Sequence, residues 1–161
     1  MKTLIVALEQ QLRLLEELHS LLKRETNELA DVHLDAMAEI NVRKEDLSSR
    51  IAAHAEKLRA AIQEVASHEG LSSKASLGEL AASFSKKGNR DIARFHAELN
   101  ATAVQIKELL ALNREIAEHF AASVGSSLDF ISRIINQTST YGASGSYQQR
   151  PAGAVLINRE A

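Results

Sequence analysis

Histidines and carboxylates are the residues of this chain whose types and spacing could support metal chemistry. The sequence has six histidines and no cysteine, so a metal site would have to be built from imidazole and carboxylate groups. A di-iron helical bundle needs two Glu-x-x-His pairs and two further carboxylates on facing helices. Only Glu16 and His19 have this spacing, and His19 falls on an apolar stripe. We therefore favour a partly buried interfacial histidine and expect no metal ion and no cofactor.

Three other patterns were considered for catalysis, and none of them is complete. His54-Ala-Glu-Lys57 has a distant similarity to the histidine of phosphotransfer bundles, but Leu58 follows where such domains have a small residue. Adjacent acids such as Glu45 and Asp46 point apart on a helix. The Gly125-Ser126-Ser127 segment has no preceding strand, so it is not a nucleophile elbow. The sequence therefore predicts no catalytic residue and a protein that is not an enzyme.

Composition excludes several classes of partner. The 19 basic and 21 acidic residues are mixed along the chain, and aromatic residues make up 4% of it, so neither a phosphate-binding patch nor a base-stacking surface is predicted. The apolar stretch near Met1 ends at Glu9, well short of the roughly 18 apolar residues of a membrane span. We expect a cytoplasmic protein that neither binds nucleic acid nor inserts into a membrane.

Heptad spacing predicts an all-α fold, an elongated antiparallel bundle of three long helices and one short helix. The first helix spans roughly residues 3 to 30, and its stripe comprises Met1, Ile5, Leu8, Leu12, Leu15, His19, Leu22, Thr26 and Leu29. A second periodic run starts at Leu34 and stops at Gly70, and the pattern leaves open whether it continues the first helix. An S-x-x-E capping box at Ser76 predicts a short helix over about 76 to 84.

The last long helix begins near Asn89 and Asp91, and it carries the candidate binding surface. Its apolar spacing drifts toward four beyond Phe120, so the stripe winds around the helix instead of staying on the bundle seam. Gly and Ser replace bulky neighbours from Val124 onward, which favours exposure there. Core packing and substrate binding both remain open for the first half of the stripe. The candidate substrate-binding residues are Leu109, Leu112, Ile116, Phe120, Val124, Leu128, Ile131 and Ile135.

The end of the chain changes character at Thr140-Tyr-Gly-Ala-Ser-Gly-Ser146, where glycines predict the end of the helix. We divide the chain into a helical domain over 1–140 and a flexible tail over 141–161, which has too little apolar content to fold alone. The order of a leucine-rich first helix, Lys44, Leu112-Asn113-Arg114-Glu115-Ile116 and the Tyr-Gly-x-x-Gly segment resembles the FlgN family of flagellar export chaperones.

The resemblance implies a function and two partners. Chaperones of this family hold the two hook-filament junction proteins in the cytoplasm by their C-terminal helical segments and bring them to the flagellar export gate. It further implies that Tyr141, with Gly142 and Gly145, docks on the large cytoplasmic domain of the gate. Ser144 departs from the family, which usually has an acidic residue there.

Two alternatives of a different kind stay open. The first is a structural coiled-coil or adaptor protein in which the heptads of the first helix form a homodimer, so that the tail has no role. The second is a chaperone for another secretion substrate, because such chaperones share helical hairpins with little sequence signal. Light scattering, together with a binding assay against the junction proteins, distinguishes them.

Overall fold

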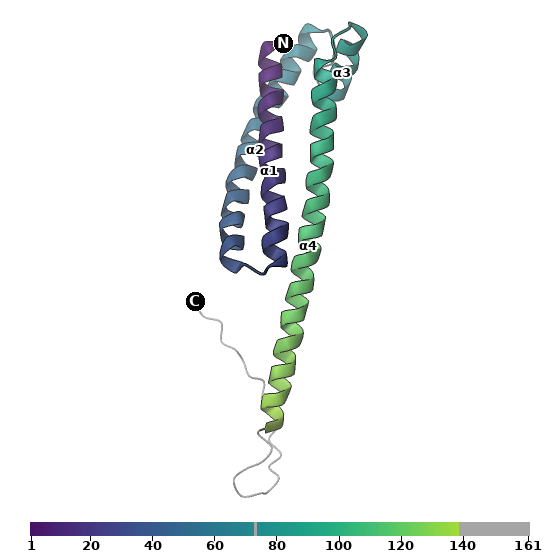
Figure 1. Ribbon diagram of the computed structural model, residues 1–161. Coiled ribbons are helices and arrows are strands. Elements are labelled where there is room, and N and C mark those ends of the chain that lie inside the picture. The colour runs from purple at the N-terminus through teal and green to yellow at the C-terminus, as the bar shows by residue number, and fades with distance from the viewer. Residues whose placement is uncertain (73, 139–161) are drawn as a thin grey trace, which may run out of the picture. The chain divides into compact units, whose positions relative to one another are not determined.

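The computed structural model describes residues 1–72 and 74–138, with side chains up to residue 135. The described residues form four α-helices and no strand: α1 (Lys2–Ala30), α2 (Leu34–His68), α3 (Leu77–Lys86) and α4 (Asp91–Thr138) (Figure 1). The predicted fold of three long helices and one short helix is therefore confirmed. The chain forms two compact units, Met1–Ala117 and the part from Glu118 onward, which are described separately below.

The turn between α1 and α2 shows that they are separate helices. Asp31 caps α1, and the backbone N–H of His33 donates to the carbonyl of Glu28 over 3.0 Å, which closes the last turn. Val32 lies between them in the left-handed region, with φ of 58°. The two helices then run antiparallel to each other (Figure 1). Gly70, with φ of 70°, ends α2 as its position in the sequence predicts.

The short helix α3 begins at the predicted capping box. The Ser76 hydroxyl accepts from the backbone N–H of Glu79 over 3.2 Å, and a Glu79 carboxylate oxygen accepts from the Ser76 backbone N–H over 2.7 Å. Leu80 and Phe84 point into the core, where they are 0% and 7% exposed. The helix extends two residues beyond the predicted end at 84, to Lys86. It therefore covers one end of the unit and connects α2 to α4.

The main core of unit 1 lies at the end where all four helices meet. It combines the first two turns of α1, the end of α2, α3 and the first turns of α4. Its buried members are Leu4, Ala7, Leu8, Ala61, Val65, Ala66, Leu80, Ala81, Phe84, Ile92, Phe95 and Leu99. The α1 heptad stripe is thus packed against other helices of the same chain at Ile5, Leu8, Leu12 and Leu15.

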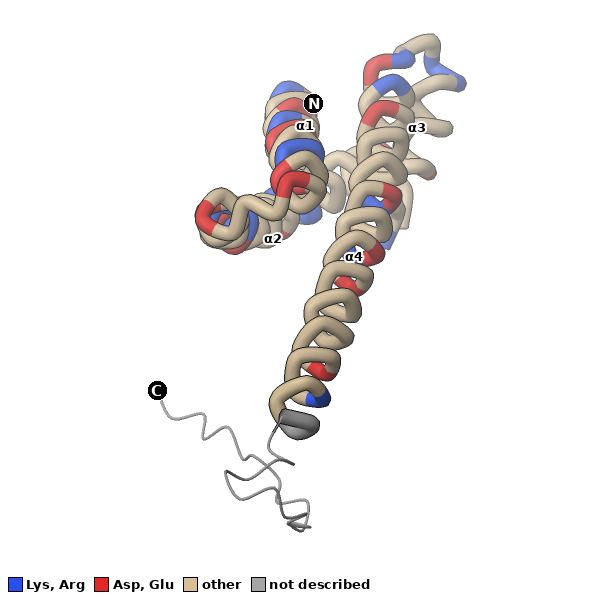
Figure 2. Tube along the Cα trace, turned by 60° about the horizontal axis from the view of Figure 1, so that its bottom comes forward, with Lys and Arg blue, Asp and Glu red and all other residues tan. Residues whose placement is uncertain are grey.

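Within unit 1, α4 runs parallel to α1, and both helices are antiparallel to α2 (Figure 1). Acidic and basic residues are mixed along α1 and α2 (Figure 2). Two exposed ion pairs link the two helices, Arg50 of α2 with Glu17 of α1 over 3.2 Å and Arg24 of α1 with Glu39 of α2 over 3.3 Å. Each of these two contributes little to stability.

The second unit consists of the remainder of α4, from Glu118 to Thr138, as far as the structure describes it. Every described side chain of this unit, from Glu118 to Ile135, is exposed. None of the described helices is both long enough and apolar enough to cross a membrane. The predicted domain boundary at residue 140 lies outside the described residues.

Candidate functional site

The histidines do not form a reactive centre in the described part of the chain. His54 is half-buried, and its Nε2 atom forms a hydrogen bond of 2.8 Å with the carbonyl oxygen of Ala7, which occupies the nitrogen that a phosphotransfer histidine would need free. His19 is half-buried on the α1 stripe. Among the described residues, no group of three or more His, Asp or Glu side chains is placed to hold a metal ion.

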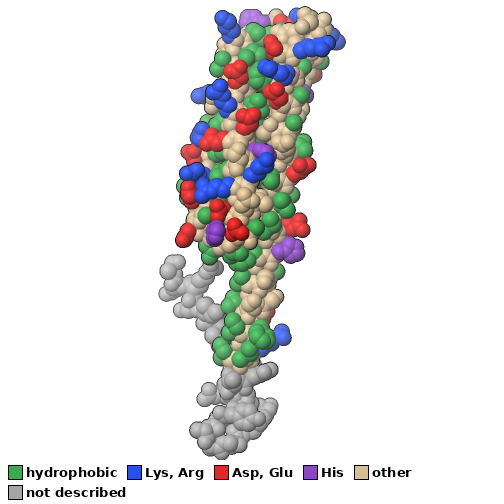
Figure 3. All heavy atoms as spheres, viewed as in Figure 1, with side chains coloured by type: hydrophobic (Ala, Val, Ile, Leu, Met, Phe, Trp, Pro, Cys, Tyr) green, Lys and Arg blue, Asp and Glu red, His purple; other side chains and the backbone are tan. Residues whose placement is uncertain are grey.

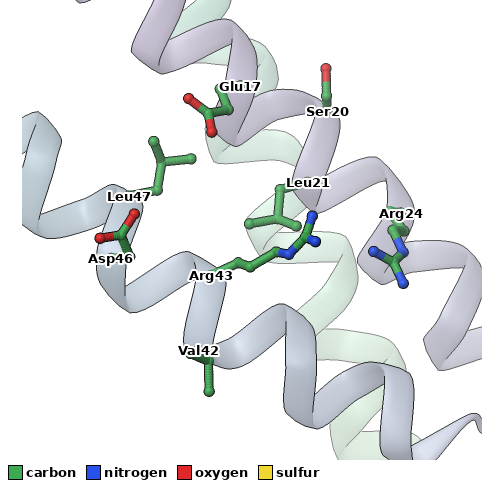
Figure 4. A pocket seen from close by; sticks show the side chains of 8 residues that line it. All are labelled: Glu17, Ser20, Leu21, Arg24, Val42, Arg43, Asp46 and Leu47. Atoms are coloured by element: carbon green, nitrogen blue, oxygen red, sulfur yellow. The ribbon is translucent and has the colours of Figure 1, made fainter.

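A surface hollow of about 540 Å³ lies between α1 and α2 (Figure 4). Its lining residues are Glu17, Ser20, Leu21, Arg24, Val42, Arg43, Asp46 and Leu47. Arg43 and Arg24 both bind Glu39, at 2.9 and 3.3 Å, while Arg50 binds both acids of the hollow. The hydrogen bond from Arg50 to Glu17 raises the pKa of Arg50 above its ordinary value. The charged side chains that line this hollow are therefore engaged in ion pairs along the hairpin.

A second hollow, of about 440 Å³, lies beside α3 and has a more apolar wall. Leu58, Ile62 and Leu77 form this wall, and Gln11 of α1 also lines the hollow. The Oε1 atom of Gln11 is buried and has no hydrogen-bond partner among the described residues. An unsatisfied carbonyl of this kind costs roughly 1–3 kcal/mol.

The largest exposed apolar surface of unit 2 lies on α4. Phe120, Val124, Leu128, Ile131 and Ile135, all predicted binding residues, are 41 to 62% exposed. At about 100° per residue they lie on one side of the helix. Figure 3 shows hydrophobic side chains gathered along this part of α4.

Two members of this surface were not predicted. Phe130 and Ile134 are 64% and 46% exposed, and their helical positions border the predicted stripe. A helical projection of the sequence places both residues beside the predicted stripe. The prediction missed them because it followed the stripe with only one residue for each turn of the helix. We call the seven residues Phe120, Val124, Leu128, Phe130, Ile131, Ile134 and Ile135 the α4 apolar face. They cover an arc of about 160°.

The charged residues of this segment lie away from the α4 apolar face. Glu118, Asp129 and Arg133 fall on the opposite side in the helical projection, with small residues such as Ala122 and Ser126 between them. The Ser127 hydroxyl donates to the carbonyl of Ser123 over 3.0 Å, which satisfies that hydroxyl within the helix. Unit 2 is thus an amphipathic helix whose apolar side can accept another apolar surface.

The first three predicted binding residues lie in unit 1, and two of them are less exposed than the rest. Leu109 and Ile116 are half-buried, and Leu112 is 43% exposed. The predicted stripe is therefore partly covered at Leu109 and Ile116 in unit 1 and exposed at its five positions in unit 2. The predicted gate-docking residues Tyr141, Gly142 and Gly145 lie outside the described residues, as does Ser144.

Comparison with known proteins gives a match to a protein family. The model of a protein family described as FlgN protein matches residues 1–149, which is most of the chain. No curated protein and no solved structure matches it. The match extends through all four helices and past the Tyr-Gly-x-x-Gly segment.

Proposed function

Because the chain belongs to the FlgN family, whose members are non-enzymatic flagellar export chaperones, we propose that it binds the C-terminal segments of the hook-filament junction proteins through the α4 apolar face. Binding keeps these segments from aggregating in the cytoplasm. The chaperone then delivers the junction proteins to the cytoplasmic domain of the flagellar export gate. Homodimerisation through the same face is the competing use of this surface.

The observation that carries the proposal is the exposure of seven large apolar side chains on one side of a helix. Contiguous exposed apolar surfaces of this kind mark interaction sites in soluble proteins. An amphipathic helical segment recognises such a surface through apolar anchors spaced three and four residues apart. In the FlgN family, the segments that the chaperone binds are the C-terminal segments of the junction proteins. These segments are helical and poorly ordered when free, so they can supply such apolar anchors.

The charge distribution of unit 2 supports apolar recognition over ionic recognition. The formal charges between residues 118 and 135 are those of Glu118, Asp129 and Arg133, all on the side away from the α4 apolar face. The affinity for a junction protein segment should therefore change little with ionic strength, because few charges are screened.

The test is a titration of the two junction protein C-terminal segments, labelled with a fluorophore, into the purified chain. Leu128→Ser combined with Ile131→Ser should weaken binding by at least about a hundredfold, because burying each such side chain stabilises a complex by roughly 1.5–3 kcal/mol. Ala122→Ser, on the opposite side of the helix, is the matched control and should bind like the parent. Equal affinities for both variants would reject the proposal. Light scattering on the same samples reports homodimers.

Gate delivery is tested separately at the tail. We propose that Tyr141 is the anchor, with Gly142 and Gly145 shaping the chain around it, since a large amphipathic aromatic is a typical hot-spot residue. Tyr141→Ala should leave folding and junction protein binding intact and weaken binding to the cytoplasmic domain of the gate. Tyr147→Ala is the control for loss of an aromatic from the tail. Ser144→Asp tests whether an acidic residue strengthens the gate contact.

A further inference from the structure

Two polar residues, Thr26 of α1 and Asn113 of α4, contact each other between the two helices. The Thr26 hydroxyl donates to Oδ1 of Asn113 over 2.6 Å, across a separation of 87 positions. The same separation aligns the other members of the two stripes, such as Leu8 with Phe95 and Leu22 with Leu109. Leu8 and Phe95 are indeed members of one buried cluster. At the Thr26–Asn113 contact the two stripes are thus aligned with a separation of 87 positions.

A partly buried ion pair between Glu25 and Lys44 extends this contact to α2. The amide nitrogen of Asn113 donates to the Leu22 carbonyl at 3.0 Å and to Oε2 of Glu25 at 2.9 Å. The other oxygen of Glu25 accepts from Lys44 of α2. Glu25 and Asn113 are both 5% exposed. Both Glu25 carboxylate oxygens and both ends of the Asn113 amide are thus hydrogen-bonded, so the cluster is satisfied.

Such a cluster adds little stability in comparison with apolar packing. Desolvation of a buried ion pair offsets most of its Coulomb attraction, and apolar replacements of similar volume are often neutral or stabilising. The best-supported effect of a buried polar residue in a helical seam is to specify register, as a single buried asparagine does in parallel coiled coils. The stripes themselves do not specify register well, because they repeat every seven residues.

We propose that Glu25, Thr26, Lys44 and Asn113 form a register lock that selects one alignment of α4 against α1 and α2. Displacing α4 by one heptad, about 10 Å, would put Ile106 or Phe120 in the place of Asn113. Neither side chain has a donor, so Glu25 would lose a hydrogen bond in a buried position, which penalises the displaced alignment. The lock acts on unit 1 and does not depend on the proposed chaperone function.

The absence of cysteine from the sequence allows the register to be read by disulfide trapping. Leu15→Cys with Thr102→Cys has the native separation of 87, and both positions are half-buried. Leu15→Cys with Leu109→Cys reports a displacement of one heptad. With the lock intact, only the first pair should cross-link. Failure of that pair, or equal cross-linking of both, would overturn the alignment.

The lock is then removed by Glu25→Leu, Thr26→Val, Lys44→Met and Asn113→Leu together. This variant should keep its helix content and its thermal midpoint, or raise the midpoint, while both cysteine pairs now cross-link. Cross-linking of the native pair alone would overturn the proposal, because the cluster would then be dispensable for register. A large loss of helix would also overturn it, because the cluster would then act by stabilising the fold.

Two further variants separate register from general stability. Glu25→Gln with Lys44→Met keeps an acceptor for Asn113 without the charge, so it should restore trapping of the native pair alone. Arg50→Gln removes an exposed ion pair between the same two helices, α1 and α2. It should also trap the native pair alone, and displaced cross-links in either variant would count against a lock centred on Asn113.

Discussion

Val32 is the residue whose backbone differs most from what its side chain favours. A non-glycine residue in the left-handed region costs roughly 1–2 kcal/mol, and the branched side chain of valine adds crowding. Val32→Gly should therefore raise the free energy of unfolding by about 1 kcal/mol, somewhat reduced by the greater flexibility of the unfolded chain. Urea denaturation followed by circular dichroism measures the gain. Val32→Ala keeps a Cβ atom and should gain much less, and a less stable glycine variant would contradict this account.

Glu79 is the carboxylate whose ionisation is coupled to a helix cap. Hydrogen bonds from the backbone N–H and then the hydroxyl of Ser76 hold the pKa of Glu79 below its ordinary value of 4.5. A carboxyl with a lowered folded-state pKa contributes stability above the unfolded value and loses it as pH falls through the folded one. The difference in urea midpoint between the parent and Glu79→Gln should thus be present at neutral pH and vanish in acid. A difference that persists in acid would assign the effect to something other than ionisation.

Isoleucines of α4 have two different roles: one kind packs in the core of unit 1 and the other forms part of the exposed α4 apolar face. Ile106 is 7% exposed and packs in unit 1, whereas Ile131 is 50% exposed on the α4 apolar face. Ile106→Ala should lower the free energy of unfolding by about 2–5 kcal/mol, through lost burial and a cavity. Ile131→Ala should change it by no more than about 0.5 kcal/mol while weakening the binding of junction protein segments. Urea denaturation measures the stability of both variants, and titration measures their binding. A larger loss of stability in Ile131→Ala than in Ile106→Ala would contradict this division.

The helices themselves could be predicted from sequence, because heptads, the Ser76 capping box and Gly70 each act through local geometry. Thr26 is already a member of the predicted stripe of the first helix, and Asn113 belongs to the motif that resembles the FlgN family. Their contact with Glu25 and Lys44 could not be predicted, because a repeat indicates which residues share a face and not which faces meet. For the same reason the candidate site was only partly predicted. Leu109 and Leu128 both follow the three- and four-residue spacing of the stripe, yet Leu109 is half-buried and Leu128 is exposed. The spacing alone therefore does not distinguish a packed position from an exposed one.

For the whole molecule, all buried residues that the structure describes lie between Leu4 and Asn113. The compact unit that contains them ends at Ala117. A chain truncated after Ala117 should therefore fold cooperatively, with a thermal midpoint within a few degrees of that of the full chain, because no buried apolar contact is removed. It should fail to bind the junction protein segments, because it lacks the α4 apolar face. Thermal melts and the fluorescence titration measure the two effects on the same preparation.

A chain truncated after Gln105 is the matched control for this experiment. It lacks Ile106 and Asn113, which are 7% and 5% exposed, so the Leu22 carbonyl and Glu25 lose a donor and the seam between α1 and α4 loses its last buried layers. Its midpoint should fall well below that of the chain ending at Ala117, since the burial of Ile106 is lost and the apolar side chains that it covers on α1 become exposed to water. If both truncations were equally unstable, residues beyond Ala117 would have to contribute to the core. If both were as stable as the full chain, the burial of Ile106 would contribute nothing to the seam between α1 and α4.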